Sequence, residues 1–333
     1  MQEPAFKHRF CLEPETARGM VEVVGDLQAP LRSQAKSTAL HRVADACLAD
    51  ALGAFGLFGA RQRIARRFAG RLLATPVERL ARRLLIFDGM VAEQGLQRAG
   101  AYALGQFTRG VTVQGLSAVP REGPLLVVAN HPGLADAAAL FAQLPRADLQ
   151  VLAAPRRLLD ALPAVHRRLI TVPEAGRGRL SAVRDATRHM RLGGAVLTFP
   201  GGRIEPDPAV RPGAVGALAR WSGCVDLFAR RVPDLTIVPV AVSGVLSSAA
   251  MQNPLTRLRR DARDRDWLAA TLQMLEAEPP DVAPTVVFGA PIRMADQITS
   301  GTARERVLAT MRDLFAPPGA DPSELPRTRV SRS

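Results

Sequence analysis

A histidine and an aspartate follow an apolar segment of the chain closely. The segment Pro124–Ala129 contains only apolar residues, and it runs directly into Asn130-His131-Pro132-Gly133, with Asp136 shortly after. A short apolar run bounded by turn residues is typical of a buried strand. Residues five apart do not share a face of one continuous helix, but a bend that begins with proline and glycine can return Asp136 to the imidazole.

A histidine held by a carboxylate can act as a general base. The imidazole takes the proton of a hydroxyl group while that hydroxyl attacks an acyl carbon, and the carboxylate selects the tautomer that leaves the other ring nitrogen free. The alternative is that His131 only hydrogen-bonds within a turn and that Asp136 only begins a helix. The motifs that follow in the chain favour the catalytic interpretation.

A second apolar run, 195–199, ends in Pro200-Gly201-Gly202-Arg203. The glycines expose backbone N–H groups and the arginine adds a fork of donors, which together suit a phosphate or a carboxylate. Alone, such a motif is more often a plain loop. A third run, 237–242, carries Pro239 at its centre. Proline cannot donate to a strand ladder, so it predicts an edge strand, a bulge or an irregularity that faces a site.

Other catalytic arrangements find no support in the sequence. It holds no G-x-S-x-G nucleophile elbow, and no cysteine adjoins a histidine. The histidines form no H-x-x-x-H or H-E-x-x-H pattern, and the three cysteines lack C-x-x-C spacing, so we expect no metal site. Scattered cysteines suit a reducing compartment rather than a disulfide framework.

In their order and spacing, these motifs resemble the glycerolipid acyltransferase family of the 1-acylglycerol-3-phosphate acyltransferase type. That family shows N-H-x-x-x-x-D after a strand, then F-P-E-G-T-R, then V-P-V or V-P-I. Asn130-His131 with Asp136, Phe199-Pro200 with Gly202, and Val238-Pro239-Val240 stand in these places. The segment Arg211-Pro212-Gly213-Ala214 is similar to the start of the helix after the third block. The resemblance covers residues 110 to 300, approximately.

The resemblance implies an O-acyltransferase that moves a fatty acyl group from acyl-CoA or acyl carrier protein to a hydroxyl of a lysophospholipid or related lipid. It implies that His131 is the general base and that Asp136 orients it. No cofactor is expected, because the acceptor attacks the thioester directly and the thioester is a co-substrate. Backbone N–H groups at a helix start or in the Gly201-Gly202 loop are expected to stabilise the oxyanion.

The sequence departs from the family pattern in three blocks, the first by Pro132-Gly133 in place of the usual polar-small pair after the histidine. Gly201 replaces the family's glutamate, Arg203 its threonine and Ile204 its arginine, and the segment 169–174 lacks the basic residue that usually ends the second block. Glu205 is a candidate replacement for the glutamate. The altered block leaves open a second hypothesis, a catalytically silent lipid-binding or membrane-adaptor protein on the same fold.

The anionic parts of the substrates are expected to meet arginines. We expect Arg203 to bind the head of the acceptor or the phosphates of CoA, with help from the backbone of Gly201 and Gly202 and from one or more of Arg177, Arg179 and Arg211.

From residue 110 onwards, predicted strands alternate with predicted helices. The strands are 111–114, 125–129, 150–153, 169–172, 195–199, 235–242 and 285–288, and the helices lie near 134–144, 156–165, 179–192, 213–231, 264–278 and 302–315. This alternation predicts an α/β fold with a mostly parallel sheet flanked by helices. We expect an acyltransferase-like domain over 110–316 and a disordered, proline-containing tail over 317–333.

Residues 1–109 are expected to form a separate helical region. The first 30 residues lack periodicity, and the helical pattern that follows is broken at the glycines of 53–59 and at Pro76. The segment 61–73 is strongly basic, with apolar residues at 64, 65, 68 and 72. Such a helix either rests on lipid or packs its apolar side on its own domain. The region is therefore expected to dock on the core, on a membrane surface or on a second subunit.

The net charge of +13 comes almost entirely from arginine, because the chain has only two lysines. A basic surface attracts anionic lipid or nucleic acid. Nucleic acid is the weaker candidate, since one tyrosine and two tryptophans make a poor stacking platform and no DNA- or RNA-binding motif occurs. The polar N-terminus shows no signal-peptide pattern. We therefore expect a cytoplasmic protein, with peripheral contact to the inner face of the cell membrane as a further possibility.

Overall fold

The computed structural model describes residues 8–10, 34–57, 62–173, 175–176, 178–295 and 302–316. Its strands are β1 (His8–Phe10), β2 (Val111–Gln114), β3 (Leu125–Ala129), β4 (Gln150–Ala153), β5 (Leu169–Thr171), β6 (Ala195–Thr198), β7 (Thr236–Ser243), β8 (Thr285–Phe288) and β9 (Ile292–Arg293). They form one nine-stranded sheet in the order β1-β2-β8-β7-β3-β6-β4-β5, with β9 paired to β7.

The sheet is mostly parallel. Parallel pairing joins β3 to β6 and β7, β4 to β5 and β6, and β2 to β8. Antiparallel pairing is found between β1 and β2 and between β7 and both β8 and β9. The predicted α/β fold class, with a mostly parallel sheet, flanking helices and an N-terminal helical region, is confirmed.

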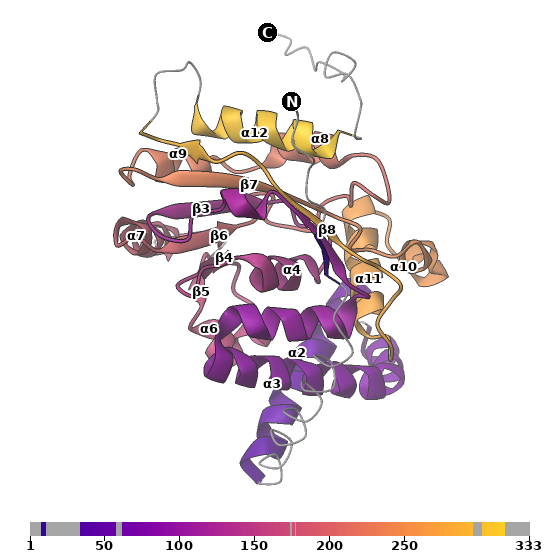
Figure 1. Cartoon of the computed structure of the whole chain (residues 1–333). Helices are drawn as coiled ribbons and strands as arrows, with labels where there is room; N and C mark the ends of the chain where they lie inside the picture. The colour runs from indigo at the N-terminus through magenta and orange to yellow at the C-terminus, as the bar shows by residue number, and fades with distance from the viewer. Residues whose placement is uncertain are drawn as a thin grey trace.

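The helices are α2 (Gln34–Ala54), α3 (Arg63–Phe107), α4 (Asp136–Gln143), α5 (Arg157–Asp160), α6 (Pro163–His166), α7 (Gly178–Arg191), α8 (Ala214–Ala217), α9 (Cys224–Ala229), α10 (Ser248–Gln252), α11 (Ala262–Met274) and α12 (Ala303–Phe315). They cover both faces of the sheet. Figure 1 shows α12 and α9 on one side of it and α2, α3, α4 and α6 on the other. Among the helices described, none has the length and apolar character to cross a bilayer.

Two hydrophobic layers follow from the alternation of side chains along each strand. In β3, Leu125 and Val127 pack with α2, α3, α4 and α6, whereas Leu126 and Val128 pack with α7, α9 and α12. Because helices cover both sheet faces, the strand has to be apolar at every position, and all its residues are fully buried. This requirement explains the uninterrupted apolar runs of the sequence.

The N-terminal helices belong to the same core as the sheet. Val43 of α2 and Val77 and Phe87 of α3 are buried in one hydrophobic cluster with β3, β7 and β8. In the structure, the region 34–107 therefore docks on the core. The separate treatment of residues 1–109 and 110–316 stays a prediction, and the tail 317–333 lies outside the described residues.

Several local expectations need correction. The first 30 residues were expected to lack regular structure, but His8–Phe10 forms β1, which depends on pairing with β2 rather than on a pattern of its own. The helix expected over 156–165 is split into α5 and α6, since Pro163 begins a new helix. The helix expected over 213–231 is likewise split, with an interruption around Trp221.

The predicted break at Pro76 is wrong. Helix α3 continues through this proline, which removes one backbone donor from a long helix. The helical path is instead interrupted at Gly95, whose φ of 81° and ψ of 172° are not helical. A positive φ is a conformation that glycine adopts without steric cost, so the bend occurs there. The predicted break at the glycines of 53–59 agrees with the end of α2 at Ala54.

Pro239 lies inside the sheet rather than at its edge. It stands opposite Val128 of β3. On the other side of β7, residues 236–237 pair with β9 and residues 240–243 pair with β8, so Pro239 falls between the two partners. Its carbonyl accepts the N–H of Gly289, the residue after β8. If the register of Val240 with Phe288 is continued by one residue, Gly289 stands opposite Pro239, and only the reciprocal hydrogen bond, which would need an N–H on Pro239, is missing. The edge-strand interpretation is therefore wrong, whereas a bulge and an irregularity that faces a site stay predictions.

Candidate active site

The adjacent parallel strands β3, β6 and β4 end at one edge of the sheet. The loops that follow them contain His131, the segment Gly201–Arg203 and Arg156, respectively. In open α/β sheets, ligands bind outside the carboxyl ends of the strands. The topology thus gathers one histidine and two arginines from separate parts of the chain at the edge where a ligand is expected.

His131 and Asp136 form the pair expected from their sequence. Nδ1 of His131 lies 2.7 Å from Oδ2 of Asp136. The Asp136 carboxylate is fully buried and also accepts the backbone N–H groups of Gly133 (3.2 Å) and Ala137 (2.7 Å). Since a carboxylate only accepts, Nδ1 carries the proton and Nε2 is left free to take one.

The bend between these two residues depends on its neighbours. The side-chain amide of Asn130 donates to the carbonyl of Val242 in β7 (2.8 Å) and accepts the N–H of the same residue (2.7 Å). These two hydrogen bonds fix the chain where β3 ends. A Cβ atom at Gly133 would lie 2.6 Å from Val245, so only glycine fits this close approach. The Pro132-Gly133 bend therefore turns the chain tightly enough to return Asp136 to the imidazole.

The environment of His131 favours its protonated form. Burial of the ring disfavours the imidazolium, but the charge and hydrogen bond of Asp136, together with the charge of Glu205, outweigh this effect and raise the pKa of His131. The side chain is 24% exposed, so a substrate hydroxyl can reach it. The Phe199 ring packs against it, with 4.7 Å between the ring centroids. Asp136 thus holds the imidazole in place, the surrounding charges stabilise its protonated form, and the ring is accessible from outside.

The glycine-arginine loop follows β6. Gly202 has a φ of +65°, and its N–H donates to the carbonyl of Phe199, which closes a turn and leaves this N–H unavailable to an oxyanion. The side chain of Arg203 is exposed. Gly201 is half-buried and lies against the carboxylate of Glu205. The loop thus offers an exposed guanidinium beside the histidine-bearing loop.

The other arginines named from the sequence are placed differently. Arg211 donates its guanidinium to the buried carboxylate of Asp266, with Nε at 3.1 Å from Oδ1. Arg179 is exposed and donates to the carbonyl of Pro173. Arg177 lies outside the described residues. An anion-binding role for Arg177 and Arg211 stays a prediction. For Arg211, a bound anion would have to compete with the carboxylate of Asp266.

Two residues of the site were missed or underrated by sequence reasoning. Arg156 ends the loop after β4 and is exposed. Its charge lowers the pKa of His131, in opposition to the two carboxylates, and its guanidinium lies 5.9 Å from the ring centroid of Trp267. No motif marks it, because only the sheet order brings β4 next to β6. Glu205 was considered only as a replacement glutamate; it accepts the backbone N–H of His131 at 3.1 Å.

A small apolar cavity adjoins the segment that carries Asp136. Its volume is about 110 Å³, and its lining comes from α3, α4 and α11. Leu134 and Ala137, on either side of Asp136, belong to that lining, as do Phe87, Tyr102 and Phe141. The N-terminal helix α3 therefore supplies part of the lining of this cavity.

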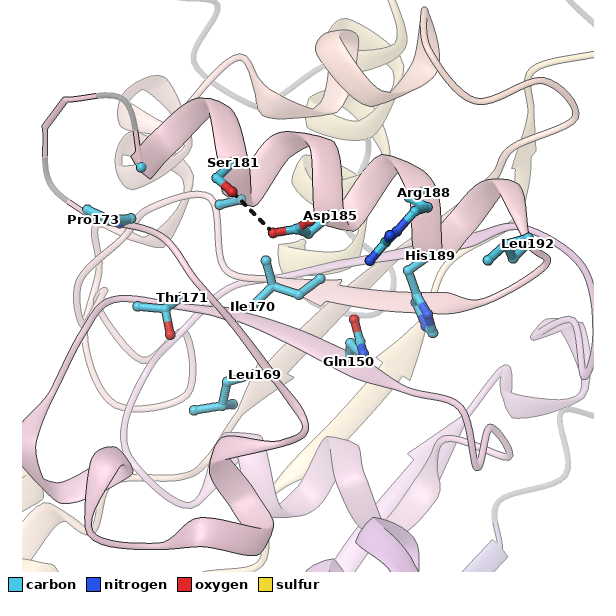
Figure 2. A pocket seen from close by; sticks show the side chains of 12 residues that line it. Gln150, Leu169, Ile170, Thr171, Pro173, Ser181, Asp185, Arg188, His189 and Leu192 are labelled. Atoms are coloured by element: carbon cyan, nitrogen blue, oxygen red, sulfur yellow. Dashed lines mark hydrogen bonds between the residues drawn. The ribbon is translucent and has the colours of Figure 1, made fainter.

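A second cavity, of about 650 Å³, lies apart from the histidine. It is situated between α7 and the strands β4 and β5, and Figure 2 shows Asp185, Arg188 and His189 of α7 above Gln150 and Ile170. His189 Nε2 is already hydrogen-bonded to the carbonyl of Asp148. Neither His131 nor Asp136 is among the lining residues, so this groove is separate from the candidate site.

Three comparisons relate the chain to known proteins. Residues 110–243 match the family model described as Acyltransferase. Among solved structures, the chain is similar to the 1-acyl-sn-glycerophosphate (LPA) acyltransferase PlsC from Thermotoga maritima, with 14% identity, 84% of this chain and 92% of that chain covered, and a TM-score of 0.39. A comparison with curated proteins found no match. The segment that matches this family model runs from β2 to β7 and contains His131, Asp136 and the Gly201–Arg203 loop.

Proposed function

We propose that the protein is an O-acyltransferase that transfers a fatty acyl group from an acyl thioester, acyl-CoA or acyl carrier protein, to a hydroxyl of a lysophospholipid or related lipid. The observation that carries this proposal is the His131–Asp136 pair at the sheet edge, with Nδ1 on the carboxylate and the ring accessible. The match of residues 110–243 to the acyltransferase family supports the class of reaction.

The reaction can be written with the residues of the chain alone. The acceptor oxygen attacks the thioester carbonyl carbon while its proton passes to Nε2 of His131. Asp136 stabilises the imidazolium that forms, and its two backbone donors hold its carboxylate in place. When the tetrahedral intermediate collapses, the carbon–sulfur bond breaks, and His131 returns the proton to the departing thiolate. The products are an ester and a free thiol.

The substrates have anionic and apolar parts, and the site offers a partner for each. Arg156 and Arg203 are exposed cations at the same sheet edge as His131, and they suit the phosphate of a lysolipid or of the thioester carrier. The apolar cavity beside Leu134 and Ala137 suits part of the acyl chain. We include Arg156 because of its position in the structure alone, whereas Arg203 is included both because of its position and because the sequence motif indicated it.

The N-terminal helices offer a surface for lipid. Ile64, Phe68 and Leu72, four residues apart along α3, are 87%, 67% and 65% exposed, and we call them, with the exposed arginines at 63, 67 and 71, the basic apolar face. The sequence left two interpretations of the segment 61–73, contact with lipid or packing on its own domain. In the described part of the chain, the high exposure of these three apolar side chains does not agree with packing on the domain. We propose that the face rests on an anionic membrane, because its cations complement lipid phosphates and its apolar side chains can enter the interface.

One experiment tests the reaction directly. Purified protein is given mixed acyl-CoAs and a lipid extract, thiol release is followed, and products are identified by mass spectrometry. We expect esterified lipid from the wild type and a loss of roughly 10²–10⁴-fold in turnover for His131→Ala. Near-normal turnover in a folded His131→Ala protein would exclude the base role. Lipid binding without thiol release, across CoA and carrier-protein donors, would instead favour the silent lipid-binding or adaptor protein.

A further inference from the structure

A buried carboxylate lies directly behind the catalytic histidine. Glu205 is only 5% exposed, yet each of its oxygens accepts one N–H: Oε2 accepts the backbone N–H of His131 at 3.1 Å, and Oε1 accepts Nε1–H of Trp221 at 2.7 Å. Both partners are donors, and an ionised carboxylate is the side-chain group that accepts at both oxygens. The site is therefore shaped for a carboxylate and not for an amide.

Glu205 also binds the other polar group of the His131 backbone. Its own N–H donates to the carbonyl of His131 at 2.8 Å. One residue of the loop after β6 thus takes both the N–H and the C=O of the histidine, although the two residues are far apart in the sequence. This double connection ties the two loops together at the residue whose ring does the chemistry.

Position 201 is shaped by the same carboxylate. A Cβ atom on Gly201 would lie 2.7 Å from Cδ and 2.8 Å from Oε1 of Glu205, closer than real Cβ contacts allow. The carboxylate therefore occupies the space into which a side chain at 201 would begin. Position 201 therefore requires glycine because the Glu205 carboxylate approaches its backbone closely, and not because of an unusual φ. A side chain at 201 and the carboxylate of Glu205 would compete for the same space.

We infer that Glu205 is a positioning residue of the acyltransferase site, which fixes the backbone of His131 while Asp136 binds its ring. This inference rests on the proposed function. The charges that face the histidine are Asp136 from α4, Glu205 from the loop after β6 and Arg156 from the loop after β4, and Arg220 faces Glu205 in turn. Of these, the two acidic groups favour the imidazolium and Arg156 opposes it.

The variant Glu205→Gln tests the inference because it keeps the shape and removes the charge. The amide can accept only one of the two N–H groups, so the other meets an NH₂ group. We expect turnover to fall roughly ten- to hundredfold, because the histidine is no longer held. We also expect the His131 ring to titrate at a lower pH by NMR, assigned with His131→Ala. The exposed Glu122→Gln serves as the matched control and should change neither quantity.

The titration keeps this inference separate from the proposed function, since it needs no turnover. If the wild type shows no transferase activity but Glu205→Gln still lowers the titration midpoint of His131, the proposed function fails, and of the inference only the effect of Glu205 on His131 is supported. If turnover falls while the midpoint stays unchanged, Glu205 is merely structural and the inference is overturned.

A second variant covers the case in which Glu205→Gln does not fold. Gly201→Ala keeps the carboxylate but pushes it from its place, since the new Cβ atom requires the same space. Reduced turnover and a lowered His131 midpoint in this variant would support the inference. Wild-type values for both in a folded Gly201→Ala protein would overturn it.

Discussion

Oδ2 of Asp136 lies 2.7 Å from Nδ1 of His131, although the aspartate begins a helix and the histidine lies in the loop that follows a strand. A straight helix would separate two residues at this spacing. The contact forms because the Pro132-Gly133 bend stands between them and because Gly133 fits against Val245 without a side chain. The pair is thus a property of the bend as much as of the two residues themselves.

The orienting role of Asp136 can be tested with Asp136→Asn. An amide at this position can donate its NH₂ to Nδ1, which would place the imidazole proton on Nε2 and remove the free base. We expect kcat to fall by roughly 10²–10⁴-fold with KM little changed, as measured by steady-state thiol release. The exposed Asp160→Asn is the matched control. A variant that retains wild-type kcat would remove Asp136 from the mechanism.

The acid limb of the pH–rate profile should reflect the raised pKa of His131. The base works only when unprotonated, so activity is absent at low pH and rises as pH passes through this pKa. Since Asp136 and Glu205 raise the pKa of His131, we expect the midpoint of kcat/KM above about 6.5, the ordinary value for histidine. A midpoint below that value, measured with a substrate that does not titrate in the range, would contradict the assigned environment.

Much of the fold could be predicted because the sheet is covered on both faces. Every residue of β3 is buried, so the strand appears in the sequence as an unbroken apolar run, and all seven predicted strands are present. Elements without such a pattern could not be found. Strand β1 and the two-residue β9 depend on pairing with their neighbours. The break in α3 was predicted at Pro76, but it occurs at Gly95 because this glycine adopts a non-helical backbone conformation.

The candidate site was predictable only where its residues are close in sequence. His131 and Asp136 share one short motif, so their spacing and the bend between them indicated a contact. Arg156 could not be found in this way, because it reaches the histidine through the order of β3, β6 and β4. The interaction of Glu205 with His131 and Trp221 depends likewise on how two loops pack, which a single sequence does not display.

A buried carboxylate holds the end of β7 and makes a stability test possible. Asp207 is 1% exposed and accepts the N–H groups of Gly244 (2.8 Å), Val245 (2.7 Å) and Leu246 (3.1 Å), as well as that of Ala209 (3.0 Å). Truncation to alanine removes the partner of these donors, of which those of Val245 and Leu246 are buried. We therefore expect Asp207→Ala to lower the free energy of unfolding by about 3 kcal/mol.

Urea unfolding followed by circular dichroism measures this change. The matched control is Asp281→Ala, at an exposed position, which should alter the free energy of unfolding by less than about 0.5 kcal/mol. Equal stability of the two variants would mean that water replaces the Asp207 carboxylate without cost.

The two exposed arginines at the sheet edge should affect substrate binding more than chemistry. We expect Arg156→Ala and Arg203→Ala each to raise KM roughly tenfold for the substrate whose anionic group they contact, because a hydrogen bond to a charged group is lost. Separate titrations of thioester and acceptor identify that substrate. Arg188→Ala, in the groove beside α7, provides the control and should leave both KM values unchanged. Unchanged KM values in the Arg156 and Arg203 variants would place the anionic groups elsewhere.

The basic apolar face should bind vesicles through its three exposed apolar side chains. Replacing Ile64, Phe68 and Leu72 together by serine removes the groups that enter the lipid interface, and a loss of about 1 kcal/mol for each predicts roughly 10²-fold weaker binding. Co-sedimentation with vesicles that contain anionic phospholipid measures this. Binding should also weaken with added salt and with neutral vesicles, because the arginines at 63, 67 and 71 act through charge.

The matched control for this face is the double variant Leu180→Ser with Leu192→Ser. These leucines of the α7 region are 64% and 83% exposed, so the substitutions remove comparable apolar surface away from α3. We expect this control to sediment with vesicles as the wild type does. If both variants lost binding equally, general hydrophobicity would explain it, and if the triple variant bound like the wild type, the face on α3 would have no part in membrane contact.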